Sequence, residues 1–95
     1  MAAYLIANVE VTDPVEYEGY KGGVPATIAA YGGRYIARGA ATEVLEGDWV
    51  PRRMVIIEFP DMAKLKAWYE SPEYRRLSAI RHRAAKSHLI AVEGS

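Results

Sequence analysis

The stretch MVIIEFPDMAKLKAWYESPEY, residues 54–74, contains the change from a strand to a helix that decides the fold. It opens with β-branched and aromatic side chains, which favour a strand, and Pro60 ends that strand because proline donates no hydrogen bond to the ladder. Asp61 then has the side chain of a helix N-cap. Ser71 and Pro72 end this helix and begin the next one, as cap and first-turn residue.

A first helix and three further strands are expected on either side of this stretch. Asp13 followed by Pro14 predicts the start of the first helix. Gly22 and Gly23 are expected to interrupt that helix, because glycine costs helix stability, and Pro25 can restart it. The predicted strands are residues 3–11, 34–40 with 42–45 as a continuation, 53–59 and 86–92, and the predicted stops and turns are residues 32–33, 46–48 and 94.

The resulting order is strand, helix, strand, strand, helix, strand, with a hairpin between the second and third strands. This order is the split βαβ pattern of ferredoxin-like domains. Both crossovers are expected to be right-handed, so the helices lie on one face of the sheet and leave the other bare. The sequence therefore predicts a single α+β domain over residues 1–95, with an antiparallel four-stranded sheet and helices on one face.

The charge balance argues against a nucleic-acid partner. The chain has 95 residues with 12 basic and 12 acidic side chains, so its formal net charge is zero. Nucleic-acid binding needs a net basic face. The local excess of basic residues is interpreted as a solvated helix face and consists of Arg75, Arg76, Arg81, Arg83 and Lys86. The chain contains no cysteine, which excludes disulfides, thiol catalysis and thiolate metal sites.

Hydropathy argues against a membrane partner and for a second copy of the chain. The N-terminal sequence MAAYLIANVE has no basic segment and too short an apolar run for a signal peptide. No stretch approaches the roughly 20 apolar residues of a membrane span, so we expect a cytoplasmic protein. Hydrophobic residues nevertheless make up 51% of the chain. A domain this small has a thin core, which favours a homodimer that covers part of the apolar surface.

The alternation of side chains along the strands predicts an apolar face beneath the helices and a mixed face without cover. The mixed face combines isoleucines with polar residues, namely Ile6, Ile36, Ile56, Ile90, Asn8, Arg38, Glu58 and His88. A second copy of the chain would cover this face and enclose a dimeric barrel. Glu58 then needs a partner, because an unpaired buried carboxylate is costly. Arg38 is the natural partner, and Arg53 or His88 are alternatives.

Four blocks of the sequence, taken in order, resemble one family. The blocks are GGRYIARG at residues 32–39, LEGDWVPRR at 45–53, IEFP at 57–60 and AWYESPEY at 67–74. They resemble the family named as the domain of unknown function numbered 1330, over nearly the whole chain. That family belongs to the dimeric α/β-barrel superfamily, so the resemblance implies a ferredoxin-like protomer and a homodimer joined through the sheets.

The wider superfamily includes cofactor-free monooxygenases, muconolactone-type isomerases and haem-handling enzymes. The resemblance therefore implies a small-molecule cavity without fixing a reaction. The cavity is expected between the sheet and the helices or within the dimer barrel. Its predicted residues are Asn8, Arg38, Trp49, Arg53, Glu58, Tyr69 and His88.

Two functional hypotheses remain open. Clustered ionisable groups among apolar side chains can have perturbed pKa values and serve as acids or bases. The first hypothesis is therefore a small-molecule-binding protein, with a cofactor-independent reaction of monooxygenase or isomerase type. The alternative is a non-enzymatic dimeric module whose buried charges, such as those of Arg38 and Glu58, only specify assembly.

Neither a cofactor nor a metal is predicted. A haem needs an axial ligand in a large apolar pocket, and His82 and His88 are the only imidazoles in the chain. A metal site usually needs three or four converging ligands, which two scattered histidines do not supply. No phosphate loop, dinucleotide fingerprint or Gly-x-Ser-x-Gly motif is present.

Overall fold

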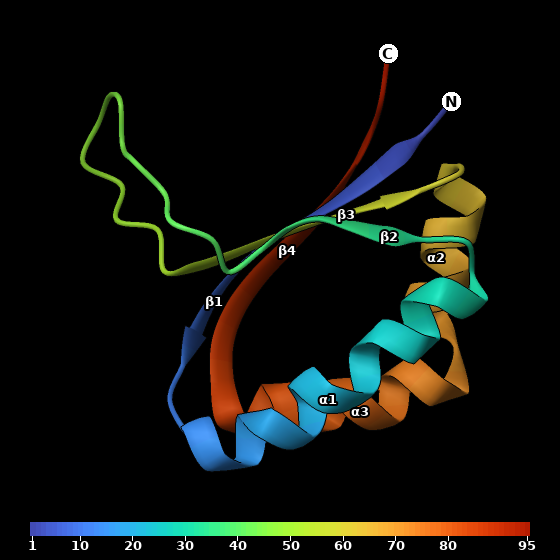
Figure 1. Cartoon of the computed structure of the whole chain (residues 1–95), viewed down its shortest axis with the longest axis horizontal. Coiled ribbons are helices and arrows are strands. Elements are labelled where there is room, and N and C mark those ends of the chain that lie inside the picture. Colours follow the sequence, from blue (N-terminus) through green and yellow to red (C-terminus); the bar gives the residue numbers. More distant parts are fainter.

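The computed structural model describes residues 1–95 and contains four strands and three helices. The elements are β1 (Ala3–Val11), α1 (Pro14–Ala30), β2 (Arg34–Arg38), β3 (Arg53–Phe59), α2 (Met62–Glu70), α3 (Pro72–Ala84) and β4 (Ala85–Glu93). The strands form one antiparallel sheet in the order β2-β3-β1-β4. The sheet curves over the helices, and both termini lie at the same end of the molecule (Figure 1).

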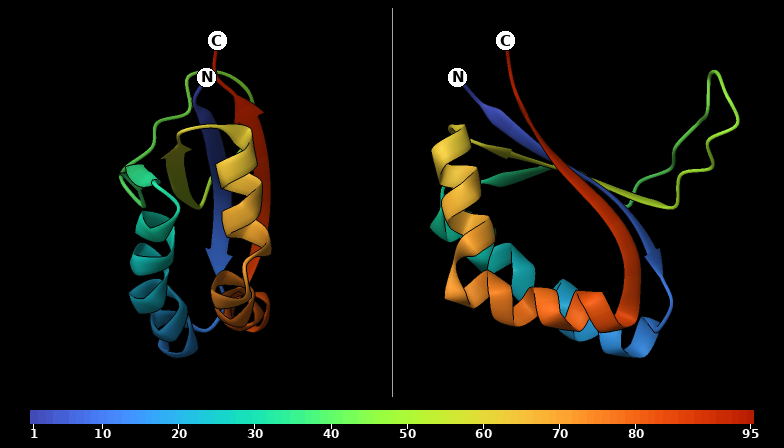
Figure 2. Two further views of the ribbon diagram at one scale, coloured as in Figure 1. Left: turned by 90° about the vertical axis from the view of Figure 1, so that its right-hand side faces the viewer. Right: turned by 180° about the vertical axis from the view of Figure 1, so that it is seen from behind.

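All three helices lie on one face of the sheet, and the opposite face carries no element (Figure 2). The predicted α+β, ferredoxin-like fold is thereby confirmed. The bare surface is called the uncovered face below. Its central residue Ile6 pairs in register with Ile56 of β3 and Ile90 of β4. None of the three helices combines the length and the apolar composition that a membrane crossing requires.

Helix α1 continues through the two glycines and the proline, so the predicted interruption at Gly22 and Gly23 was wrong. Pro25 lies inside α1. Because proline has no N–H, the carbonyl of Lys21 lacks its helical donor. Arg38 Nη2 donates to this carbonyl at 2.9 Å. A side chain from the sheet thus replaces the hydrogen bond that the proline removes, and the helix continues.

A β-bulge in β2 decides the direction in which Arg38 points. The pairing of β2 with β3 shifts between Tyr35 and Ala37, which leaves Ile36 as an extra residue. Arg38 therefore pairs with Val55, on the helix-facing side of the sheet. Strict alternation predicts Arg38 beside Ile36 on the uncovered face, and this prediction was wrong because the extra residue reverses the order of the faces.

The connection between β2 and β3 is a long loop, residues 39–52, which projects away from the body of the protein (Figure 1). The predicted strand continuation at 42–45 was wrong, because these residues have no strand partner. The loop starts at Gly39, whose φ of 66° lies in the left-handed region that favours glycine. Large hydrophobic side chains in the loop are exposed, including Leu45 at 87% and Trp49 at 58%.

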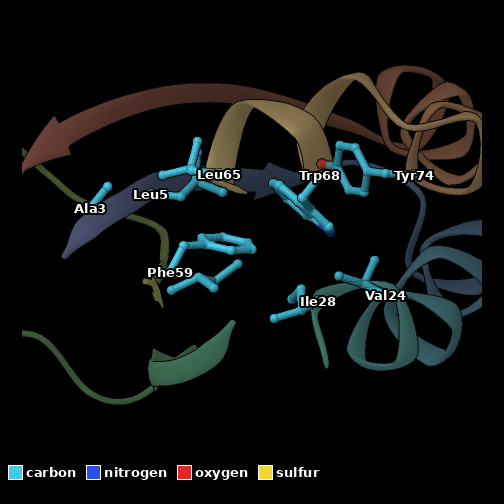
Figure 3. Packing of buried hydrophobic residues seen from close by; sticks show 9 residues of the cluster. Ala3, Leu5, Val24, Ile28, Phe59, Leu65, Trp68 and Tyr74 are labelled. Carbon is cyan, nitrogen blue, oxygen red and sulfur yellow. The ribbon is translucent and has the colours of Figure 1, made fainter. Parts of the chain in front are cut away.

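The main core is a hydrophobic cluster with an aromatic centre, and it lies between the sheet and all three helices (Figure 3). Trp68 and Tyr74 have no exposed surface, and their ring centroids are 4.0 Å apart. Phe59 of β3 lies 5.3 Å from Trp68 between centroids. Trp68 also donates from Nε1 to Thr27 Oγ1 at 3.0 Å, so its polar atom has a partner inside the core.

The predicted caps explain how α2 and α3 begin. Asp61 accepts a hydrogen bond from the backbone N–H of Lys64 at 2.7 Å. Ser71 accepts from the N–H of Tyr74 at 3.2 Å and donates to the carbonyl of Trp68 at 2.7 Å, so one hydroxyl serves both helices. A second, smaller core cluster lies at the far end of the sheet and contains Ala7, Val9, Tyr17, Ala84 and Ala85.

Two glycine substitutions are expected to change stability in opposite directions. A Cβ at Gly33 would lie 2.7 Å from Phe59 Cε1 and 2.8 Å from Ile28 Cγ2, both in the core. We expect Gly33→Ala to lower the free energy of unfolding by about 1–3 kcal/mol through overpacking. Gly22→Ala meets no atom within 4 Å, and we expect a gain of about 0.5–1 kcal/mol from helix propensity. Urea unfolding monitored by circular dichroism measures both, and equal effects would contradict the packing described.

Candidate functional site

A cavity lies on the helix-facing side of the sheet, between the sheet, α1 and α3. It leaves about 30 Å³ for the centres of water molecules, and its empty volume is about 430 Å³ when the open mouth is included. Ten of the 14 side chains that line it are hydrophobic, including the rings of Tyr17, Tyr20 and Tyr35. The remaining four are all cationic, namely Lys21, Arg38, Arg53 and Arg81.

Arg81 of α3 is the most deeply buried of these cations, with 3% of its surface exposed. Its Nη1 donates to Ser87 Oγ at the start of β4, and its Nε is buried without any hydrogen-bond partner. The interpretation of Arg81 as part of a solvated helix face was wrong. A signal for its burial exists in the sequence, because Tyr74, Ser78 and Arg81 follow one another at i, i+4 and i+7 and share a helix face.

Arg53 enters the cavity from the sheet. It pairs with Val9 on the helix-facing side, and its Nε is also buried without a partner. Its guanidinium lies directly beneath Gly39, where a Cβ would collide with it. The positive φ of Gly39 and this close approach together require glycine at the position. The first residue of the 39–52 loop therefore fixes where the Arg53 side chain lies.

No carboxylate lines the cavity. The ion pairs of the protein lie elsewhere and join Lys21 to Glu18 at 3.4 Å, Arg34 to Glu58 at 2.7 Å and Arg83 to Glu16 at 2.7 Å. Arg38, Arg53 and Arg81 thus have no acidic partner. Arg38 instead donates to the Lys21 carbonyl and stacks on the ring of Tyr35, with 4.6 Å between its guanidinium carbon and the centroid.

The tyrosines of the cavity are held in the neutral form. Burial raises the pKa of Tyr20, and the nearby Tyr74, whose hydroxyl is 2.8 Å away, adds to the increase. Burial also raises the pKa of Tyr17 and of Tyr35, although Arg53 and Arg38 respectively act against it. Burial acts to lower the pKa of Arg81, but the negative charge that Tyr74 and Tyr20 acquire on ionisation outweighs it, and the pKa is raised. At neutral pH the cavity therefore combines charged arginines with protonated hydroxyl groups.

Glu58 lies on the uncovered face, away from the cavity. Its Oε1 accepts from Arg34 Nε at 2.7 Å, and its Oε2 accepts from the Tyr4 hydroxyl at 3.2 Å. The prediction of Arg38, Arg53 or His88 as its partner was wrong, because the bulge turns Arg38 to the other side of the sheet. The hydrogen bond from Arg34 holds the pKa of Glu58 below its usual value.

The remaining predicted site residues are dispersed over the surface. Asn8 lies on the uncovered face, opposite His88 in register, and its Oδ1 accepts from the N–H of Arg52 at 2.8 Å. Trp49 is exposed on the 39–52 loop. Tyr69 is half-buried beside Trp68. Of the predicted site residues, only Arg38 and Arg53 line the cavity, and ligand-binding roles for all of them stay predictions.

Sequence reasoning missed three cavity residues of α1, namely Tyr17, Tyr20 and Lys21. Their spacing with Val24 is i, i+3, i+4 and i+7, which places them on one helix face. That spacing was hidden by the expected break at the glycines. No three histidine, aspartate or glutamate side chains converge closely enough to hold a metal ion.

Removal of Arg34 is expected to raise the pKa of Glu58 toward its ordinary value, because the first cause of the decrease is the hydrogen bond between them. A lowered pKa in the folded state stabilises the protein above the pKa of the unfolded state, and this stabilisation is lost as the pH falls through the folded value. The free energy of unfolding of Arg34→Gln should therefore be lower than that of the wild type at neutral pH, and the difference should disappear in acid. The Glu58 carboxyl carbon followed by NMR titration measures the pKa, with Arg76→Gln as control, and an unchanged titration would contradict the pairing.

The fold and the site define a ferredoxin-like protein with a cationic, tyrosine-lined cavity beneath its helices. The family described as Domain of unknown function (DUF1330) matches residues 2–95, and the chain belongs to this family. A comparison with curated proteins finds no match.

Solved structures with the same fold cover nearly the whole chain. The RPA0582 protein of unknown function from Rhodopseudomonas palustris is 21% identical with a TM-score of 0.78, over 99% of this chain and 82% of that one. A dimeric ferredoxin-like protein of unknown function from Jannaschia sp. CCS1 is 11% identical, with a TM-score of 0.71. The match covers 99% of this chain and 100% of the Jannaschia chain. SnoaB, a cofactor-independent oxygenase from Streptomyces nogalater, is 11% identical, with a TM-score of 0.67. The match covers 99% of this chain and 93% of the SnoaB chain. At these low sequence identities, the similarity shows that the fold is shared and no more.

Proposed function

We propose that this protein binds a small organic molecule in the cavity between the sheet and helices α1 and α3. The observation that carries the proposal is the composition of the cavity, which combines apolar walls with a few converging polar groups, as ligand sites usually do. The enclosed part of the cavity leaves only about 30 Å³ for the centres of water molecules, so a bound molecule must extend into the open mouth. Of the four cations of the cavity, Arg38 is exposed, Lys21 and Arg53 are half-buried, and Arg81 is buried.

The proposal includes a homodimer joined through the uncovered faces. Ile36 on one edge strand and Ile90 and Val92 on the other are 50%, 60% and 43% exposed in the single chain. Ile56 and Ile6 lie on the two strands between them, and such a row of large hydrophobic side chains is unusual on a surface in contact with water. The Jannaschia protein, which is dimeric and ferredoxin-like, supports the same arrangement here. Trp49 of the 39–52 loop, which is 58% exposed, is a further candidate for this interface, because tryptophan often anchors such contacts.

A cofactor-independent reaction is the candidate activity, and the fold shared with SnoaB supports it. The cavity holds no carboxylate or imidazole, and its tyrosines have raised pKa values. Its own groups can therefore donate hydrogen bonds and stabilise negative charge, as an oxyanion or enolate site does. The alternative, a dimeric module without a ligand, predicts no saturable binding in the cavity.

Blocking the cavity is expected to abolish binding. Val55 is half-buried and lines the cavity from β3, so Val55→Phe places a ring in the space. We expect phenol, indole, benzamide or benzoate to shift the backbone amide signals of cavity residues in NMR spectra of the wild type, and the affinity to fall at least about tenfold in Val55→Phe. Ala79→Phe, on the exposed side of α3, is the matched control and should bind as wild type.

Two results would contradict this proposal. The first is a panel in which no molecule shifts the cavity signals of the wild type. The second is a Val55→Phe variant that is folded by circular dichroism and binds as well as the wild type, since the ligand would then lie elsewhere.

A charge on the uncovered face is expected to break the dimer. Ile90→Lys alters a side chain that is 60% exposed in the single chain, so the protomer should keep its fold. A lysine there would be buried without a partner in the dimer, which is costly. Light scattering after size exclusion should then give the mass of a 10.5 kDa monomer. Ala63→Lys on the exposed side of α2 is the control and should stay dimeric, and a dimeric Ile90→Lys would contradict the interface.

A further inference from the structure

We propose that the molecule bound in the cavity is a flat anion, an aromatic or conjugated carboxylate or enolate, and that Arg53 and Arg81 hold its charged group. This inference deepens the proposed function and rests on it. Four cationic side chains and no carboxylate line the cavity, so its charge is uncompensated by the protein. The chemistry that complements such a cavity is a negatively charged group on an apolar body.

The burial of Arg81 makes this argument specific. Only 3% of its surface is exposed, and lysine and arginine are almost never buried so fully without a partner. The protein supplies only neutral groups, because Nη1 donates to Ser87 Oγ, Nη2 lies 3.5 Å from His82 Nε2, and Nε has no partner. The ring of Tyr20 lies 5.9 Å from the guanidinium carbon, near the limit for a cation–π contact. These contacts do not replace a counter-ion, because a buried charge needs both pairing and hydrogen bonds.

Arg53 and Arg81 act on the same region of the cavity. The phenol of Tyr17 lies in the field of both guanidiniums, since each acts to lower its pKa against the larger effect of burial. Arg53 comes from the sheet and Arg81 from α3, so the two arginines face the cavity from opposite walls. The Nε atoms of both are buried without partners. A carboxylate has two oxygens and about four lone-pair positions, which suits donors that approach from two sides.

The other walls indicate the shape of the ligand. Tyr17, Tyr20 and Tyr35 contribute rings, and β1 and β3 contribute aliphatic side chains. Such walls favour a flat apolar body. The exposed Arg38 and the half-buried Lys21 would attract an anion from solvent, because fields of one sign in a low-dielectric cleft concentrate the oppositely charged ligand.

A structural role for the arginines makes different predictions. If Arg81 served only to stabilise the fold, its replacement by an apolar residue would lower stability and leave the preference for ligand charge unchanged. If it is held for an anion, the ligand-free protein carries an unsatisfied buried charge. Arg81→Met should then leave the ligand-free protein at least as stable as the wild type, as replacement of buried charges by apolar residues often does.

The test uses three probes of the same size and shape whose charges are −1, 0 and +1: benzoate, benzamide and benzamidine. Binding is measured by NMR titration of the full chain at low salt. We expect benzoate to bind at least about tenfold more tightly than benzamide, and benzamidine to bind more weakly than either. Added salt should weaken benzoate binding and leave benzamide unchanged.

The variants locate the charged group. Arg81→Met should lower the affinity for benzoate at least about tenfold while benzamide binds within about twofold of the wild type. Arg53→Met should have the same effect and serves as the second variant if Arg81→Met does not fold. Arg76→Met, which removes an exposed arginine from the same helix, is the matched control and should leave both affinities unchanged.

The possible results separate the two proposals. Benzamide binding as well as benzoate to the wild type would overturn the anion inference and retain the proposed ligand cavity. Benzoate preference that persists in both arginine variants would overturn the assignment to Arg53 and Arg81. Absence of binding by any of the three probes to the wild type would overturn the proposed function together with this inference.

Discussion

The hydrogen bond from Arg38 to the carbonyl of Lys21 joins the edge of the sheet to the middle of the first helix. It exists because two irregularities coincide. Pro25 leaves the carbonyl without its helical donor, and the bulge at Ile36 turns Arg38 toward the helices. Without the bulge, Arg38 would point to the uncovered face and the carbonyl would stay unpaired. One contact therefore links α1 to β2 beside the cavity and supplies the donor that the helix lacks.

The distribution of charge differs between the two sides of the sheet. On the uncovered face, Glu58 is neutralised by Arg34 and bonded by Tyr4 within the same chain. On the helix side, Arg81 is buried and Arg53 has a buried Nε, and neither arginine has an acidic partner. Local pairing explains the first arrangement, since it lets a carboxylate approach a surface that a second copy would cover. The second arrangement is costly for a folded protein alone and makes sense if the missing partner comes from outside.

The fold was largely predictable because its signals are local and strong. The caps at Asp61 and Ser71, the proline boundaries and the alternation along β1 and β3 each depend on a few neighbouring residues, and the structure has all of them. The bulge was not predictable, because the short β2 carries residues that suit either face. A bulge arises from pairing with β3, which no local pattern records.

The site was predicted less well than the fold, for a related reason. Charge and a position on a strand single out Arg38 and Arg53, but the face on which Arg38 is expected depends on an unbroken register. The burial of Arg81 is hidden because it lies in a run of basic residues, which is typical of a solvent-exposed helix face. Its spacing from Tyr74 and Ser78 nevertheless places it on the buried face of the helix. In a helix with several like charges, spacing identifies the buried member better than composition does.

The cavity separates the two hydrophobic clusters of the protein. Leu5, Val24 and Ile57 of its wall belong to the main cluster, and Val9 and Tyr17 belong to the smaller one. A molecule held there would be a missing piece of the interior that joins the two clusters. Because a ligand that binds only the native state adds to stability with its concentration, the supply of that molecule would set how long each copy survives proteolysis in the cell. If the cavity holds such a molecule, the amount of the protein would follow the concentration of that molecule without a dedicated regulator.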